Sequence, residues 1–176
     1  MPIMDVRYAA GSLDEGAKAA LAERLTDVLI RMEGGADTPD GRAFAWVYFT
    51  AFRPEDLWVA GAPAAAARTF LVHVSIPEGY MNRTHKDEVH AWVAGAIEAT
   101  TGRADSAVLT VIDEVTEGNW GSRGRPISLE TIAAAVGQPA DGPRLAWSRS
   151  YFAAKARAMA EAGYPADAGG LPFPAA

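Results

Sequence analysis

The chain begins MPIMDVRY (residues 1–8), in which a proline precedes a run of alternating apolar and polar residues that is typical of a β-strand. Proline has no amide hydrogen to donate within a sheet, so it occurs at the first residue of a strand or on an edge. Pro2 is therefore either a simple start for this strand or a reactive group. Removal of Met1 would leave Pro2 as a secondary amine at the chain terminus, which can act as a base or a nucleophile.

Composition excludes several classes of function. The 176 residues are enough for one domain with a sizeable core, and 49% of them are hydrophobic. A formal net charge of -6 and a pI near 5.0 argue against binding to nucleic acid or to an anionic membrane. The absence of cysteine excludes disulfides, thiolate zinc sites and cysteine nucleophiles. No stretch reaches the roughly 18 apolar residues of a membrane span and no leader pattern is present, so we expect a cytoplasmic protein.

A β-α-β pattern occupies residues 2–61. An expected strand at residues 2–8 is followed by SLDE (residues 12–15), in which Ser12 and Glu15 have the spacing of a helix capping box. AFAWVYFTAF (residues 43–52) predicts a second strand, and the RPEDLWVAGAP that follows it predicts a turn with a short hairpin. The apolar residues that share one face of the helix between the strands are Leu21, Leu25, Val28, Leu29 and Met32.

The same pattern repeats over residues 68–125. RTFLVHVSI (residues 68–76) predicts a strand, residues 83–100 predict a helix, and SAVLTVIDEV (residues 106–115) predicts a fourth strand. TEGNWGSRGRP (residues 116–126) then repeats the tryptophan-containing turn of the first unit. Each unit joins two strands through a helix, so its strands are expected to be parallel, with a right-handed crossover.

Two tandem β-α-β units predict an α/β (α+β) domain over residues 1–137, with a four-stranded sheet and two helices on one face. The opposite face then has no helical cover. We expect it to carry Met4 and Val6 among its apolar residues and to be covered by a neighbouring subunit. Residues 138–176 are expected to form a linker, one more helix that covers the sheet or a subunit interface, and a Pro/Gly/Ala-rich tail.

This arrangement resembles the tautomerase superfamily, whose members are built from β-α-β units and use an amino-terminal proline as the catalytic group. The resemblance covers about residues 2–130 and rests on Pro2, the Glu78-Gly79 turn and GNWGSRG (residues 118–124), which lies where 4-oxalocrotonate tautomerase has a glycine-rich, aromatic-centred hairpin. The two-unit length is similar to malonate semialdehyde decarboxylase and cis-3-chloroacrylic acid dehalogenase. Their trimers imply a homotrimer here, with sites built from adjacent subunits.

The sequence departs from this family at the arginines that bind substrate carboxylates. Tyr80 takes the place of the arginine after the Glu-Gly turn, and Leu109 takes the place of the strand arginine. Leu29 and Val111 stand where the dehalogenase has a histidine and a tyrosine. The resemblance therefore implies the catalytic proline without the usual clamp, which argues against chloroacrylate dehalogenation and malonate semialdehyde decarboxylation.

We predict Pro2 as the catalytic residue, with Trp120 as a wall of the site, because Trp120 matches the aromatic residue that lines the tautomerase site. Glycines on both sides of Trp120 would let backbone amides approach a substrate oxyanion. The alternative for Trp120 is a core side chain that fixes the hairpin. Asn119 is either a hydrogen-bond donor to the substrate or a turn residue.

Three further residues are candidates for substrate binding. Arg123 and Arg125 can replace the lost clamp by binding a carboxylate, or can be solvated loop residues. Tyr80 either offers its hydroxyl where the family has arginine or packs at an interface. His85 and His90 are five residues apart and do not share a helix face, so we expect no metal and no cofactor.

The predicted function is tautomerisation of an enol or 2-oxo acid, a small-molecule substrate, by a neutral Pro2 that acts as a general base. A hydratase or lyase that uses the same amine is one alternative. A non-catalytic scaffold or ligand-binding protein with the same fold is the other; the missing arginines favour it, and the retained Pro2 and GNWG (residues 118–121) oppose it.

Overall fold

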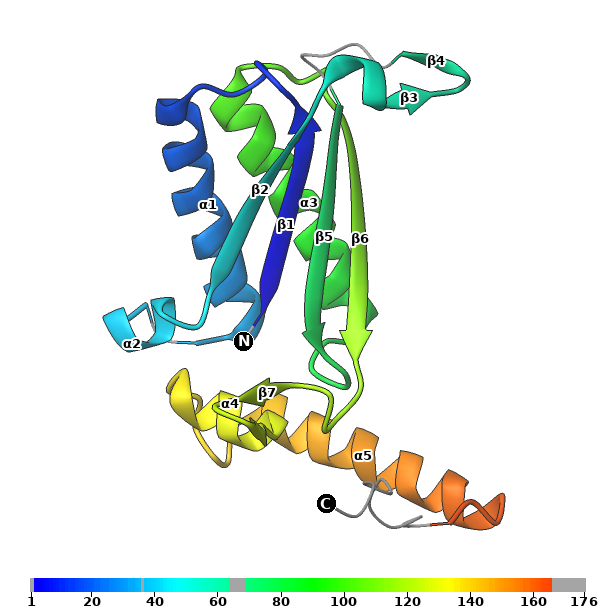
Figure 1. The fold of residues 1–176 in the computed structure, drawn as a ribbon. Helices are drawn as coiled ribbons and strands as arrows, with labels where there is room; N and C mark the ends of the chain where they lie inside the picture. The colour runs from blue at the N-terminus through cyan, green and yellow to red at the C-terminus, as the bar shows by residue number, and fades with distance from the viewer. Residues whose placement is uncertain (1, 36, 64–68, 166–176) are drawn as a thin grey trace, which may run out of the picture.

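The computed structural model of the chain describes residues 2–35, 37–63 and 69–165 (Figure 1). Its centre is a four-stranded sheet in the strand order β2-β1-β5-β6. The four strands are β1 (Ile3–Ala9), β2 (Trp46–Phe52), β5 (Thr69–Pro77) and β6 (Ala107–Val115).

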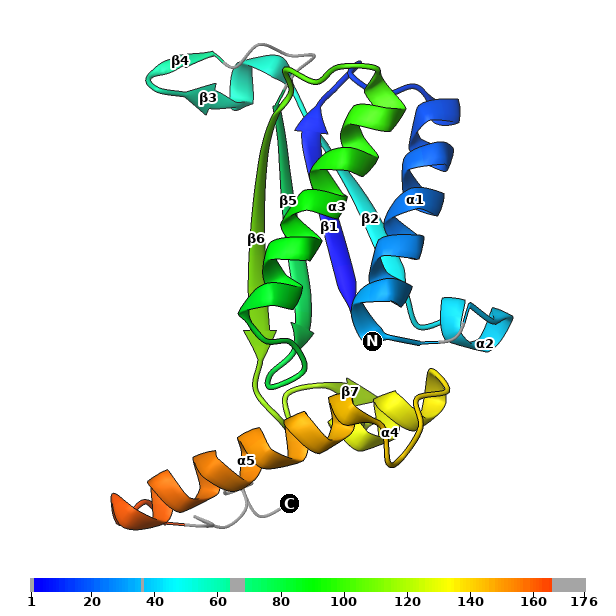
Figure 2. The same ribbon diagram turned by 180° about the vertical axis from the view of Figure 1, so that it is seen from behind.

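The two halves of the sheet are built in the same way. α1 (Glu15–Glu33) connects β1 to β2, α3 (Arg83–Thr101) connects β5 to β6, and both strand pairs are parallel. β1 and β5 meet antiparallel at the centre, with Ile3 opposite Ser75. Figures 1 and 2 show both helices on the same face of the sheet. The predicted fold class and the two β-α-β units are confirmed.

The helices end where the sequence supplies capping groups. The side chain of Asp14, rather than the predicted Ser12, caps α1 by accepting a hydrogen bond from the amide of Ala17 at 2.7 Å. α1 stops at Gly34, whose φ of 63° is a left-handed conformation that glycine adopts without strain. Asn82 caps α3 by accepting from the amide of His85 at 3.0 Å, which confirms the predicted start of that helix.

The core lies between the sheet and the two helices. Burying one large aliphatic side chain stabilises a fold by about 1.5–3 kcal/mol, so this layer supplies most of the driving force for folding. The fully buried residues at its centre are Met4, Val6, Leu21, Leu25, Leu29, Val72, Val74, Val89, Val93 and Ile97.

The expectation that Met4 and Val6 lie on the uncovered face of the sheet is wrong. Both side chains are fully buried against the helices. Side chains alternate along a strand, so the odd-numbered Ile3, Asp5 and Arg7 occupy the opposite face. The exposed large apolar side chains on that opposite face, placed there by the strand register, are Trp46, Tyr48 and Leu109.

A short hairpin follows each unit, as predicted. β3 (Trp58–Val59) pairs with β4 (Ala62–Pro63), and β7 (Gly121–Ser122) pairs with β8 (Arg125–Pro126). In each hairpin the two connecting residues both have positive φ, as a type I′ turn requires. The β3-β4 hairpin lies at one end of the sheet and β7 lies at the other (Figure 1).

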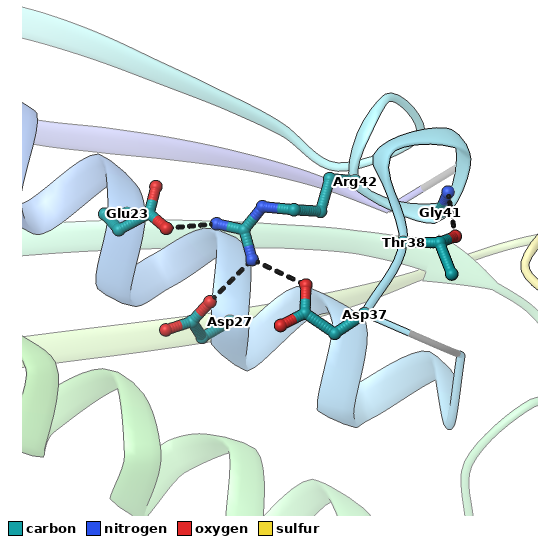
Figure 3. A network of polar contacts seen from close by, with 6 residues as sticks. All are labelled: Glu23, Asp27, Asp37, Thr38, Gly41 and Arg42. Carbon is teal, nitrogen blue, oxygen red and sulfur yellow. Dashed lines mark hydrogen bonds and ion pairs between the residues drawn. The ribbon is translucent and has the colours of Figure 1, made fainter.

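A small helix after α1 is fixed by one arginine. α2 (Pro39–Arg42) places the Arg42 guanidinium 2.5 Å from the Glu23 carboxylate, and 2.9 Å from each of the Asp27 and Asp37 carboxylates (Figure 3). Glu23 and Asp27 belong to α1, so the arginine joins the two helices. All three carboxylates are largely exposed, and solvent therefore weakens each ion pair.

The C-terminal part of the chain lies across the end of the sheet, and not on its face. α4 (Leu129–Ala135) and α5 (Pro143–Glu161) lie where β1 begins and where β5 and β6 end (Figures 1 and 2). None of the described helices, α5 included, is long and apolar enough to span a membrane.

The loop after β5 holds α5 in place. The Glu78 carboxylate accepts a hydrogen bond from the Tyr151 hydroxyl at 2.7 Å and forms an ion pair with Lys155 Nζ at 2.6 Å. The Lys155 contact and then the Tyr151 contact lower the pKa of Glu78. The buried hydroxyl of Ser148 donates to the carbonyl of Gly79 at 2.8 Å. The Glu78-Gly79 turn is therefore a docking point for α5.

We expect the substitution Gly79→Ala to loosen α5. Gly79 has a φ of 73°, and a Cβ there would lie 2.6 Å from Cδ1 of the Tyr151 ring. Gly102 is a matched control, because its φ is 66° and a Cβ there would meet nothing within 4 Å. Gly102→Ala should show only the backbone strain of about 1–2 kcal/mol, whereas Gly79→Ala should add about 1–3 kcal/mol of overpacking. Thermal unfolding, with tryptic cleavage at Lys155 as a local probe, distinguishes the two variants; equal losses would contradict the packing role.

Candidate functional site

Pro2 is buried at the start of β1, at the end of the sheet where α4 and α5 lie. Its carbonyl accepts a hydrogen bond from the amide of Trp46 at 3.3 Å, which ties this residue to β2. The antiparallel pairing of β1 with β5 begins next to Pro2, where Ile3 is opposite Ser75. The loop that follows β5 therefore lies at the same end of the sheet as Pro2.

A cavity of about 330 Å³ lies at this end of the molecule, between that loop, the start of α3 and the start of α5. Its lining combines two aromatic rings with a guanidinium, an imidazole and a side-chain amide. The residues are Tyr80, Asn82, His85, Pro143, Arg144 and Trp147.

Tyr80 is the predicted site residue that lines this cavity. Its side chain is 1% exposed, and its hydroxyl donates to the carbonyl of Glu33 at 2.5 Å and accepts from Gln138 Nε2 at 2.6 Å. Burial, followed by the charge of Glu33, raises the pKa of Tyr80 above its usual value. The Tyr80 hydroxyl thus joins α1 to the C-terminal part of the chain, and the Tyr80 ring is the part that can line the cavity.

Arg144 is the cation of the cavity and comes from the second residue of α5. Its Cζ lies 5.5 Å from the centroid of the Tyr80 ring, and its Nη1 donates to the carbonyl of Met32 at the end of α1. A Cβ on Gly34 would lie 2.8 Å from that Nη1, so a larger residue there would displace the arginine. A guanidinium has five N–H donors, which leaves donors of Arg144 for a ligand.

His85 is the second polar group of the cavity. Burial and then the positive charge of Arg144 lower the pKa of His85, which keeps its imidazole neutral at pH 7. Its Nδ1 is buried and has no hydrogen-bond partner among the described residues. A neutral imidazole of this kind can donate or accept one hydrogen bond to a bound molecule, depending on its tautomer.

Glu33, the last residue of α1, is a buried carboxyl beside this site. Its side chain is 2% exposed, and burial raises the pKa of Glu33 to about 7. The positive charge of Arg144 opposes that rise. A group whose pKa is near neutral can exchange protons at physiological pH.

The four predicted residues of the β7-β8 segment do not line the cavity, although β7 lies at the same end of the sheet (Figure 1). Trp120 is partly buried, and its indole Nε1 is buried without a hydrogen-bond partner in the described part of the chain. Asn119, Arg123 and Arg125 are exposed, and Arg123 occupies the turn with a φ of 52°. Within one chain, Tyr80 therefore lines the cavity, whereas the four residues of the β7-β8 segment lie outside its lining.

Sequence reasoning missed Arg144, His85 and Glu33. Arg144 lies outside the region of the family resemblance, and His85 was considered only as a metal ligand. Glu33 stands at the end of an amphipathic helix, where a glutamate is usually exposed. Among the described residues, no group of three or more histidine, aspartate and glutamate side chains is arranged to hold a metal ion.

No protein-family model matches the chain, and no curated protein matches it either. Solved structures do match its fold. A fused 4-OT, solved as a symmetric wild-type trimer, has a TM-score of 0.61 and 23% identity, covering 77% of this chain and 99% of that chain. N1, a member of the cis-3-chloroacrylic acid dehalogenase family, has a TM-score of 0.62 and 18% identity, covering 91% and 96%. Pt0534 inactivated by 2-oxo-3-pentynoate has a TM-score of 0.61 and 20% identity, covering 74% and 98%.

These likenesses agree with the fold class that the sequence alone suggested, a four-stranded sheet built from two β-α-β units. At identities of 23% and below they concern the fold and not the reaction. The predicted resemblance is confirmed at the level of the fold, which is like that of the fused 4-OT and of N1.

Proposed function

We propose that the chain is a small-molecule tautomerase in which Pro2, after removal of Met1, is the general base. The observation that carries this proposal is the position of Pro2: it is buried at the end of the sheet that also holds the cavity with Arg144 and His85. A terminal amine has a reference pKa of about 8, and burial and nearby cations favour its neutral form. The neutral amine takes a proton from an enol substrate and returns it to carbon, which yields the keto form.

Arg144 and His85 supply the polar contacts that the proposed reaction needs. The guanidinium is suited to a carboxylate or to the oxygen that becomes negative in the transition state. The neutral imidazole adds one hydrogen bond to the same molecule. We therefore propose that Arg144, from the C-terminal part of the chain, takes over the role of the arginines that are absent from the strands and turns of the two units.

We also propose that Trp120 forms a wall of the complete site, with Asn119, Arg123 and Arg125 at its rim. What supports this is their position on the hairpin at the same end of the sheet, and the buried Trp120 Nε1 without a described partner. In this role Trp120 donates a hydrogen bond to the substrate or to a neighbouring subunit.

Assembly as a homotrimer is part of the proposal. The uncovered face of the sheet exposes Trp46, Tyr48 and Leu109, and the β3-β4 hairpin exposes Trp58, which is 59% accessible. The matching fused 4-OT is a trimer. We propose that copies of this chain cover these apolar surfaces in the trimer. The domain at residues 1–137 would form the contacts between subunits. We also propose that the protein is cytoplasmic.

The first test is the removal of Met1 and the substitution Pro2→Ala. The intact mass should lack methionine; a mass that includes it would contradict the proposal, because Pro2 would then be an amide. Given the processed protein, ketonisation of phenylenolpyruvate or 2-hydroxymuconate should fall at least tenfold in the Pro2→Ala protein, since general-base catalysis contributes about 10²–10⁴-fold.

Treatment with 2-oxo-3-pentynoate should label the wild-type amine, and peptide mass spectrometry should locate the label on Pro2. Unchanged turnover in the variant would refute the role.

Arg144→Met should raise KM at least tenfold for an enol that carries a carboxylate, and much less for an enol without one. The physical reason is the loss of a charge-assisted hydrogen bond to the substrate. Arg149→Met is the matched control on the same helix, because Arg149 is bonded to the exposed Glu130 at 2.7 Å and does not line the cavity. An equal loss for both substrates would indicate that Arg144 only supports the structure at the Met32 carbonyl.

A further inference from the structure

The uncovered face of the sheet carries a band of polar side chains that crosses its strands. The strand register places Asp5 of β1 opposite His73 of β5, and His73 Nδ1 lies 3.3 Å from Oδ2 of Asp113 on β6. Asp5 is bound elsewhere, because its two carboxylate oxygens accept from the Thr50 hydroxyl at 3.0 Å and from Arg7 Nε at 2.7 Å. In the described part of the chain, the ion-pair partner of Asp113 is therefore the His73 imidazole alone.

This polar band lies among the apolar side chains that the sheet leaves exposed. Trp46 and Tyr48 border the band on β2, and Leu109 borders it on β6. Exposed aromatic side chains that lie together are typical of a surface that a protein partner buries. The band holds carboxylates and cationic groups side by side, so a copy of the same surface can face it without a net excess of one charge. The occupant that fits this face is therefore a second copy of the chain.

Burial of the face affects its two ionic contacts differently. Asp5 and Arg7 form an ion pair with no net charge, whereas Asp113 beside a neutral imidazole remains an unpaired anion. Burying an unpaired charge is much more costly than burying an ion pair that keeps its hydrogen bonds. We propose that a second copy docks on this face with His73 protonated, so that formation of the trimer takes up one proton per chain. The proposal rests on the proposed homotrimer, and it adds the side chain that makes the assembly depend on pH.

The other charged and titratable groups of this region do not alter that balance. Asp5 and Arg7 neutralise each other, and Tyr48 beside them is a phenol, which is uncharged near neutral pH. Glu114 and Lys86 form their own ion pair at 2.8 Å, and the alternation along β6 places Glu114 on the opposite face of the sheet. The contact between β5 and β6 is therefore the one whose net charge changes near neutral pH.

The sign of the pH dependence follows from this proton. An imidazole in water loses its proton at about pH 6.5. Assembly that favours the protonated ring is strongest below that pH, and it weakens as the pH rises through the value at which the assembled protein loses the proton. The formal net charge of -6 on each chain acts in the same direction, because a bound proton reduces the repulsion between copies.

The test measures self-association of the full chain by sedimentation over a dilution series at pH 6 and pH 8. We expect the dissociation constant of the trimer to rise roughly a hundredfold or more between these two pH values, because up to about three protons are linked to one trimer. If dilution alone does not separate the subunits, urea is added, and the urea concentration that half-dissociates the trimer should be lower at pH 8 than at pH 6.

Two substitutions should act in opposite directions. His73→Gln leaves Asp113 without a cation at every pH, so this variant should associate at pH 6 as weakly as the wild type does at pH 8. Asp113→Asn removes the unpaired charge, so that variant should associate at pH 8 as tightly as the wild type does at pH 6. His90→Gln is the matched control, because His90 is an exposed imidazole on α3 and should leave the pH dependence unchanged.

A wild-type trimer with the same stability at both pH values would overturn the proton uptake while leaving the proposed trimer intact. An unchanged pH dependence in His73→Gln, or a trimer that Asp113→Asn weakens, would do the same. A monomer at every pH and concentration would overturn both the trimer and this inference. If one of the two variants does not fold, as judged by circular dichroism, the other and the wild type still decide the question. None of these outcomes bears on the role of Pro2, which the activity of Pro2→Ala tests separately.

Discussion

The carbonyl groups at the end of α1 are the constraint on which this end of the molecule depends. The last carbonyls of a helix have no partner within the helix, and they carry the negative end of its dipole. Here the carbonyl of Met32 binds Arg144, and the carbonyl of Glu33 binds Tyr80 and Gln138. Those three donors come from two segments that are far from α1 in the sequence. A requirement of helix geometry therefore fixes the C-terminal part of the chain over the start of the first strand.

This single docking arrangement has consequences for chemistry. It places a guanidinium against the Tyr80 ring, lowers the pKa of His85, and closes water away from Glu33. The low exposure that raises the pKa of Glu33 also strengthens its attraction to the nearby Arg144. The packing of α5 against the end of α1 consequently also determines the electrostatics of the cavity.

The fold was predictable because it is encoded by periodicity. Alternation in the strands, apolar stripes in the helices and paired turns specified two β-α-β units without any contact information. The face of the first strand was not predictable in the same way, because Met4 and Val6 alternate equally well in either orientation, and only packing against α1 and α3 decides between them. The site was predicted least well. Pro2 was suggested by its position, whereas Arg144 and Glu33 lie more than 100 residues apart and form one environment only after α5 has docked.

Duplication of the β-α-β unit has a chemical consequence that its internal symmetry conceals. β1 and β5 are equivalent strands, yet β5 begins in the interior of the chain, where its first nitrogen is an ordinary peptide amide. Under the proposed function, each polypeptide therefore contributes one catalytic amine, although it contains two copies of the unit. In the second copy, the loop after β5 instead holds α5 in place through Glu78 and Gly79. The proposed reaction would thus use one half of the doubled architecture, and the docking of the C-terminal helix uses the other.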